Sequence, residues 1–277
     1  MLDATGCRRR ALAWMLWGGT TAGTAQGALN APRPPRQWHS AFQQRLADWG
    51  PAVSGWGFDN HRWLAEPGVP GQLLRVLLRQ GSIDPGSMLR RGLPRSGTGF
   101  KAPVLQPGAD AATLRYRVRF PADFDFVRGG KLPGLYGGRG NSGGAIPSGR
   151  DGFSLRLMWR SQGDAEVYAY LPTSQGHGSS LLRGQARFTP GRWHEVQQTV
   201  VLNRPGENNG RVELRLDGQL AGVATGLRLR DVPELHIDGV FFEVFFGGND
   251  DTWAARADTH VDFASFMLVA HTLEQRP

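Results

Sequence analysis

The period-two alternation in residues 153–171 constrains the fold of this chain more than any other feature. In FSLRLMWRSQGDAEVYAYL the odd-numbered positions on both sides of SQGD are apolar, which is typical of strands with one face in a core. The SQGD segment predicts a turn, so the two halves predict a β-hairpin. The even-numbered positions instead carry Ser154, Arg156, Met158, Arg160, Tyr168 and Tyr170. We therefore predict one buried face and one polar, aromatic face.

Strand patterns also dominate the rest of the chain. The 39 glycines and 18 prolines suit many short strands joined by turns, and Asp217-Gly218 predicts a tight hairpin. No long amphipathic helix is present; we expect one short helix in residues 37–49 and a loop at 81–98. Further strands are predicted at residues 72–79, 99–105, 112–120, 191–203, 211–222, 239–248 and 259–269. These patterns predict an all-β chain that folds as a single antiparallel β-sandwich, a β-jelly roll of concanavalin-like type.

Residues 1–27 have the layout of a secretory signal peptide. Three arginines at positions 8–10 precede an apolar run that is too short to span a membrane, and small residues follow it. Paired arginines also permit twin-arginine export. We therefore expect a secreted or periplasmic protein, with a linker and short helix at residues 28–54 and the β-jelly-roll domain at residues 55–277.

Charge and cysteine content narrow the partners. The single cysteine, Cys7, precedes the expected cleavage after Ala25 or Gly27, so the processed chain has no thiol for disulfides, thiolate metal sites or a cysteine nucleophile. The full chain carries a formal net charge of +8, and loss of residues 1–25 removes three arginines and one aspartate, which leaves +6. A basic exported protein attracts polyanions. We expect an acidic polysaccharide as the partner, no nucleic acid, no membrane anchor and a monomer.

The polar face of the hairpin suits the chemistry of uronic acids. With the turn at residues 161–165, Arg156 is predicted opposite Tyr170 and Met158 opposite Tyr168, so that these side chains and Ser154 form one patch. A cation stabilises the enolate-like dianion that forms when a uronate loses its C5 proton. A phenol beside a cation is a better base, and a phenol can also protonate the departing O4 oxygen. Such β-elimination needs no cofactor.

The same face also suits binding without catalysis. Tyrosine and arginine side chains commonly line sugar-binding clefts or simply cover a sheet. A non-catalytic, lectin-like module for acidic polysaccharides is therefore the alternative to an enzyme. No pair of acidic residues typical of a retaining glycosidase stands out, which argues against hydrolysis.

Three short motifs connect the chain to a known family. GGKLPGL at residues 129–135, S-x-R at 154–156 and Y-x-Y at 168–170 resemble those of polysaccharide lyase family fourteen, and the likeness covers residues 72–269. The resemblance implies a secreted or viral β-jelly-roll enzyme that cleaves alginate or glucuronan by elimination. The working residues that it implies are all present in type: Lys131, Ser154, Arg156, Tyr168 and Tyr170.

Two assignments of roles fit these five residues. In the first, Tyr170 or Tyr168 acts as base and acid while Arg156 and Lys131 neutralise the carboxylate, and Ser154 holds substrate or orients a neighbour. In the second, Lys131 accepts the proton, because a buried lysine has a lowered pKa.

Further polar patterns each admit a purely structural explanation. The arginines within 115–119 either follow a polyanion or form a solvated strand face, and Trp253 either stacks on a sugar or packs in the core. The acidic segment 249–251 matches no calcium loop. The pairs His236-x-Asp238 and His260-x-Asp262 share strand faces but lack a third ligand, so we predict no metal site.

Overall fold

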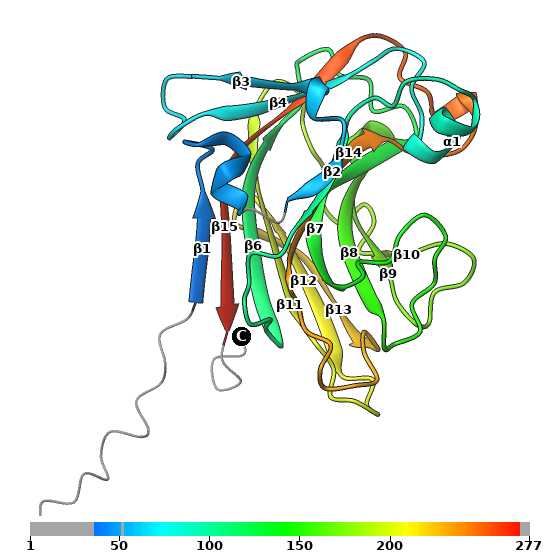
Figure 1. Ribbon diagram of the computed structural model, residues 1–277. Helices are drawn as coiled ribbons and strands as arrows, with labels where there is room; N and C mark the ends of the chain where they lie inside the picture. The colour runs from blue at the N-terminus through cyan, green and yellow to red at the C-terminus, as the bar shows by residue number, and fades with distance from the viewer. Residues whose placement is uncertain (1–35, 51–52, 272–277) are drawn as a thin grey trace, which may run out of the picture. The chain divides into compact units, whose positions relative to one another are not determined.

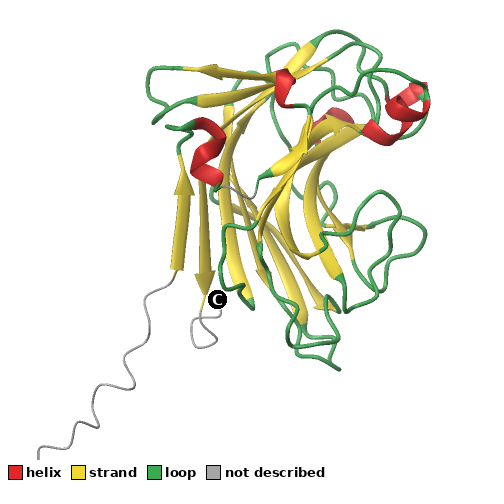
Figure 2. Ribbon diagram, viewed as in Figure 1, coloured by secondary structure: helices red, strands yellow, loops and turns green. Residues whose placement is uncertain are grey.

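Alternating apolar residues build both β-sheets of the structure, a computed structural model that describes residues 36–50 and 53–271. On β6 (Ala111–Arg119) the even-numbered side chains are fully buried, and on β8 (Gly152–Arg160) the odd-numbered ones are. These strands belong to different sheets, yet their buried side chains share one core. Figures 1 and 2 show the two sheets as layers with few helices. The predicted antiparallel β-sandwich is thereby confirmed.

The larger sheet has eight antiparallel strands. Its path runs β13-β12-β11-β6-β15-β4-β3, and β1 pairs with the C-terminal part of β15. The Asp217-Gly218 turn joins β12 to β13 as predicted, with positive φ at both residues, the conformation that tight hairpins require. The bounds are β13 (Gln219–Leu227), β12 (Gly210–Leu216), β11 (Trp193–Val201), β15 (Thr259–His271), β4 (Leu73–Leu78), β3 (His61–Leu64) and β1 (Arg36–Ser40).

The smaller sheet has seven antiparallel strands in the order β10-β9-β8-β7-β14-β5-β2. One face of this sheet packs on the shared core, and the other face holds the cleft described below. The bounds of its other strands are β10 (Ser179–Leu181), β9 (Ala165–Tyr170), β7 (Gly129–Gly138), β14 (Gly239–Phe246), β5 (Thr98–Ala102) and β2 (Ser54–Trp56).

Polar bonds join the two sheets across the core. The Gln198 side chain on β11 accepts from the Leu135 N–H (3.0 Å) and donates to the Leu155 carbonyl (2.8 Å). The Tyr116 hydroxyl on β6 donates to the Pro133 carbonyl (3.0 Å). These bonds satisfy polar groups that have lost contact with water. They also fix β7 and β8, which carry much of the cleft, against the larger sheet.

β7 contains a bulge at Pro133, which has no N–H group to donate to a neighbouring strand. Before the bulge Lys131 pairs with Met158, and after it Tyr136 pairs with Ser154. Directly paired residues point to the same side of a sheet. Residues 131 and 136 therefore share a face, although strict alternation would place them on opposite faces.

The helical segments are short and lie between strands. In the predicted loop 81–98, residues Pro85–Arg90 instead form α1, whose first turn is capped by the Asp84 carboxylate accepting from the Ser87 N–H (3.0 Å). The 3₁₀ segments are η1 (Arg45–Trp49), η2 (Phe58–Asn60), η3 (Ser161–Gly163) and η4 (Asp251–Trp253).

The short helix expected in residues 37–49 is wrong in its first half. Residues 36–40 form β1, because the edge of β15 offers backbone groups to pair with, and only η1 is helical. The Trp38 and Trp49 rings then meet edge to face, 4.8 Å apart.

The predicted signal peptide lies outside the described residues. No helix within the described part of the chain is long and apolar enough to cross a bilayer.

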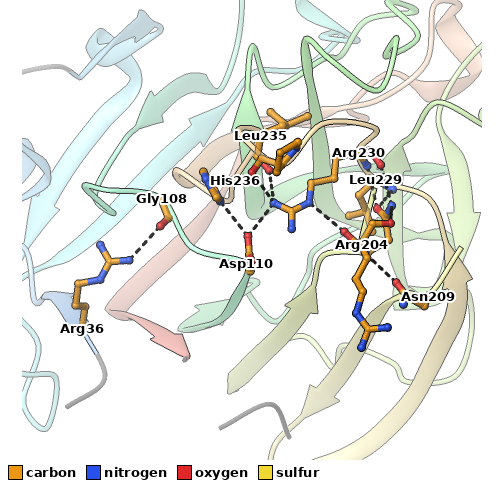
Figure 3. Close-up of polar contacts among 11 residues, drawn as sticks. Arg36, Gly108, Asp110, Arg204, Asn209, Leu229, Arg230, Leu235 and His236 are labelled. Atoms are coloured by element: carbon orange, nitrogen blue, oxygen red, sulfur yellow. Dashed lines mark hydrogen bonds and ion pairs between the residues drawn. The ribbon is translucent and has the colours of Figure 1, made fainter. Parts of the chain in front are cut away.

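A polar network fastens the loops that follow β11 and β13 (Figure 3). The buried Arg230 guanidinium donates to the Asp110 carboxylate and to the Leu235 carbonyl, each at 2.8 Å. His236 Nδ1 lies 3.0 Å from the same carboxylate. The metal-type pairing of His236 with Asp238 is therefore not formed; the Asp238 carboxylate accepts from the Gly138 N–H (2.7 Å) instead.

Candidate active site

The outward face of the smaller sheet contains a cleft of about 620 Å³. Loops around α1, residues 142–143, His177 and residues 247–253 form its walls. Its floor comes from β7, β8, β9 and β14, through Lys131, Arg156, Met158, Arg160, Tyr168, Tyr170, Glu243 and Phe245. Four of the five site residues predicted from the sequence thus line one cleft.

The predicted parity of the hairpin is confirmed, but the predicted register is wrong. Arg156 pairs with Tyr168, and Ser154 pairs with Tyr170. The turn is shorter than expected: η3 closes it over residues 161–163, and Trp159 already pairs with Ala165. The shift is two residues, so every side chain keeps its predicted face.

Arg156 lies almost entirely out of solvent, with 2% of its surface exposed. Its Nη1 atom donates to the Glu243 carboxylate on β14. Its Nε and Nη2 atoms are buried, and neither has a hydrogen-bond partner among the described residues. The rings of Phe241 and Tyr170 lie 4.8 and 5.5 Å from the guanidinium carbon. A buried guanidinium edge without a partner is suited to receive a ligand carboxylate.

In Arg160 the corresponding Nε/Nη2 edge of the guanidinium binds a carboxylate. Its Nε and Nη2 atoms each donate to one oxygen of Glu166 at 2.7 Å, and Glu166 is fully buried. This bidentate pair is the strong form of the arginine–carboxylate contact. The Nε and Nη2 atoms of Arg160 are therefore both bonded to a carboxylate of the protein, whereas the same two atoms of Arg156 have no partner among the described residues.

Lys131 is a buried amine without a direct acidic partner among the described residues. Its Nζ atom lies 2.9 Å from Met158 Sδ and 3.4 Å from the centre of the Tyr168 ring. Burial lowers the pKa of Lys131 well below its ordinary value, and the positive charge of Arg156 lowers it further. The amine of Lys131 therefore loses its proton more readily than the amine of an exposed lysine.

The two tyrosines have different surroundings. Burial, followed by the neighbouring Tyr170, raises the pKa of Tyr168, so its phenol keeps its proton. The Tyr170 oxygen accepts the Gly144 N–H at 3.0 Å, and its ring meets that of Tyr168 at 74°, 5.8 Å between centres. A phenol oxygen that accepts one hydrogen bond still has its own proton to donate.

Ser154 is the one predicted site residue that does not line the cleft. It is fully buried, and its hydroxyl donates to the Asn141 carbonyl at 2.6 Å. Asn141 in turn donates to the Asp151 carboxylate (3.0 Å), which ties the loop after β7 to the start of β8. Ser154 thus holds the backbone close to Tyr170, its strand partner.

Two buried glutamates were not among the predicted site residues: Glu243, which lines the cleft, and Glu166, which binds Arg160. Glu166 has the parity of Tyr168 and Tyr170, which could have placed it on the same face. Glu243 is the one charge within GVFFEVFF, and a lone charge in a buried strand needs a partner. The register predicted for the hairpin sets Arg160 opposite Glu166, the residue that its guanidinium contacts, whereas no sequence signal identifies the partner of Glu243.

The other polar patterns lie on the larger sheet or at the cleft wall. The arginines of β6 lie in the larger sheet, where Arg119 pairs with Glu66 (2.6 Å) and with Asp262 (2.8 Å). His260 lies 3.8 Å from Asp262, and burial lowers its pKa. Trp253 lines the cleft beside Arg160, at 5.8 Å. No group of three or more metal-ligating side chains occurs in residues 36–50 and 53–271.

Comparison with known proteins places the chain in a family. The family described as Polysaccharide lyase 14 matches residues 69–266. The chain is 31% identical to the PL-14 alginate lyase of Aplysia kurodai, with 85% of this chain and 98% of that chain covered and a TM-score of 0.73. No curated protein sequence matches the chain.

More distant structures share the fold. An alginate lyase from Chlorella virus is 20% identical, with a TM-score of 0.69 over 82% of this chain and 96% of that chain. An endo-β-1,4-glucuronan lyase from Trichoderma reesei is 10% identical, with a TM-score of 0.52 over 79% and 90%. The family match favours an enzyme over the non-catalytic binding module. The chain belongs to polysaccharide lyase family 14 and is a polysaccharide lyase.

Proposed function

We propose that this lyase cleaves a 4-linked polyuronate, with alginate as its substrate, by β-elimination in the cleft of the smaller sheet. The observation that carries the proposal is the free Nε/Nη2 edge of Arg156, which lies in one cleft with a buried amine and two phenols. The 31% identity to the Aplysia kurodai alginate lyase supports alginate over glucuronan, because the glucuronan lyase of Trichoderma reesei is only 10% identical to this chain.

Arg156 is assigned to the substrate carboxylate. Removal of the C5 proton spreads negative charge onto that carboxylate, and a fixed guanidinium in a water-poor cleft stabilises this charge more in the transition state than in the ground state. The bidentate geometry between Arg160 and Glu166 shows how the same edge of an arginine holds two carboxylate oxygens.

Lys131 is assigned as the proton acceptor, the second of the two roles considered from the sequence. A base must be unprotonated, and burial together with Arg156 lowers the pKa of Lys131 in that direction. Tyr168 is less suited to the role because its pKa is raised. An uncharged Lys131 would not neutralise the carboxylate, which leaves that task to Arg156.

Tyr170 is assigned as the acid that protonates the departing O4 oxygen. The Gly144 N–H occupies one acceptor site of its oxygen, so the hydroxyl proton is free to point into the cleft. Tyr168 lies beside Lys131 in the floor of the cleft, with its ring packed against the Lys131 amine.

The experiment compares Lys131→Ala and Tyr170→Phe with Tyr136→Phe as a matched control. Tyr136 is a buried tyrosine of the same sheet and does not line the cleft. We expect Lys131→Ala and Tyr170→Phe to lower kcat on alginate by about 10²- to 10⁴-fold, the usual range for a lost general base or acid. Tyr136→Phe should retain activity. Near-normal turnover of either cleft variant would remove that residue from its assigned role.

Export is part of the same proposal, since alginate is an extracellular polymer and residues 1–27 have the layout of a signal peptide. Expression of the full chain in a bacterium with both export routes, followed by N-terminal sequencing, tests it. A mature start after Ala25 or Gly27 in the periplasm or medium is expected. An intact N-terminus in the cytoplasm would contradict it.

A further inference from the structure

The side-chain nitrogen atoms of Arg156 differ in their partners. Nη1 contacts Glu243, whereas Nε and Nη2 lie on the side-on edge of the guanidinium and are buried without partners in the described part of the chain. In Arg160 this side-on edge is the one that Glu166 occupies with two bonds of 2.7 Å. The edge left free in Arg156 is thus the edge that holds a carboxylate elsewhere in the same cleft.

Glu243 occupies a position that suits it to fix this division. It lies on β14 between Phe241 and Phe245, is 7% exposed, and pairs across the strand with Gly99, which has no side chain. Phe241 stacks on the guanidinium at 4.8 Å. The ring packs against the guanidinium plane, and the Glu243 carboxylate binds Nη1 and leaves the Nε/Nη2 edge without a partner among the described residues.

Two basic side chains, Lys101 and Arg156, lie near Glu243. Lys101 on β5 lies near both Glu243 and Arg156: the negative charge of Glu243 raises its pKa and the positive charge of Arg156 lowers it, although burial is the largest effect and lowers it. Two cations therefore face one carboxylate at this end of the cleft. A substrate carboxylate on the free edge of Arg156 would complete two pairs, which compensates the cost of burying the charges.

We propose that Glu243 is a positioning residue: it binds Nη1 of Arg156 so that the Nε/Nη2 edge faces the uronate carboxylate at the cleavage site. The proposal rests on the polyuronate elimination proposed above. Glu243 acts through Arg156 and does not touch the substrate. Its contribution must therefore vanish when Arg156 is removed.

A double-mutant cycle tests this, with kcat/KM on alginate measured for Glu243→Ala, Arg156→Ala and the double variant. We expect Glu243→Ala to lower kcat/KM by about 10- to 100-fold, the range for a lost charge-assisted hydrogen bond. The double variant should match Arg156→Ala within about twofold. If Glu243→Ala lowers the rate by its full factor again in the Arg156→Ala background, Glu243 acts independently and the proposal is wrong.

Two further variants keep the result interpretable. Glu243→Gln keeps the volume and one oxygen acceptor, so it should fold even if Glu243→Ala does not, and should lose about three- to tenfold in kcat/KM. Glu213→Gln is the matched control: Glu213 pairs with Arg215 (2.7 Å) in the larger sheet, and its loss should leave activity unchanged. Full activity of Glu243→Gln and Glu243→Ala beside an impaired Arg156→Ala would overturn the positioning role alone. Full activity of Arg156→Ala would instead overturn its role in the proposed function.

Discussion

The side-chain nitrogen of Lys131 lies 3.4 Å from the centre of the Tyr168 ring, against the face of the phenol. The two nearby carboxylates, Glu243 and Glu166, are each bonded to an arginine, so neither pairs directly with this amine. Burial, followed by the positive charge of Arg156, lowers the pKa of this amine well below its ordinary value and so makes the neutral form more accessible. This relationship distinguishes the two roles that the sequence allowed for Lys131.

The pH profile of the reaction separates those roles. As a proton acceptor Lys131 must be unprotonated, so kcat/KM should rise with pH through its pKa, and this rise should lie below the ordinary lysine value of 10.5 because burial lowers the pKa. A Lys131 that served as a cation would lose activity over the same interval. Measuring kcat/KM on alginate from pH 5 to pH 10 decides between them.

Replacing Lys131 by methionine should abolish activity but stabilise the fold. The unfolded chain holds the lysine proton up to about pH 10.5, whereas the folded chain releases it at lower pH. The lysine therefore costs stability at neutral pH, and this cost shrinks as pH rises toward 10.5. We expect Lys131→Met to gain about 1–3 kcal/mol in urea unfolding at pH 7, and less at pH 9. A loss of stability at pH 7 would contradict the burial of an uncompensated amine.

Ser154→Ala should affect stability more than chemistry. The hydroxyl is buried and bonds to the Asn141 carbonyl, away from the cleft lining. Its removal should cost roughly 1–2 kcal/mol of unfolding free energy and less than about tenfold in kcat, since the loop beside Tyr170 loses one anchor. Parallel urea titrations and rate assays check this. A 100-fold loss of kcat at unchanged stability would return Ser154 to the substrate-contacting role that the family resemblance implied.

His61 should make the fold sensitive to acid. It is buried, with its Nε2 3.0 Å from the Thr98 hydroxyl, and burial lowers its pKa from 6.5 to about 4. The stability that its neutral form contributes is present above pH 6.5 and is lost as pH falls toward 4.

The corresponding measurement compares unfolding free energies at pH 7 and pH 4 in wild type and His61→Gln. The drop between the two pH values should be smaller by about 3 kcal/mol in the variant. Equal drops would show that His61 does not titrate as described.

Much of the fold followed from local patterns because alternate residues of strands such as β6 and β8 are apolar and face the shared core. The odd-numbered residues of the hairpin had to share a face whatever the turn length, so Arg156 and Tyr168 were correctly grouped even though their register was shifted by two. The register itself depended on η3, a turn whose length the SQGD segment does not fix.

Other parts of the site depend on contacts between distant segments. Parity alone would have turned Lys131 and Tyr136 to opposite faces, and only the bulge at Pro133 brings Lys131 into the cleft. The prediction that Lys131 belongs to the site came from the family resemblance. Glu243 lies 87 residues from Arg156, so no local pattern could pair them. Similarly, β1 forms because β15 provides an edge, which local propensity within residues 37–49 cannot reveal.

The most direct test of the central claim is ultraviolet absorbance of the C4–C5 double bond that elimination creates. The full chain is incubated separately with alginate, glucuronan and a neutral glucan. We predict a rise in absorbance on alginate and none on the neutral glucan, where no carboxylate meets Arg156. A rise in absorbance on glucuronan alone would show that glucuronan, and not alginate, is the substrate. No rise on either acidic polymer, despite measurable binding to them, would contradict polyuronate elimination by this chain.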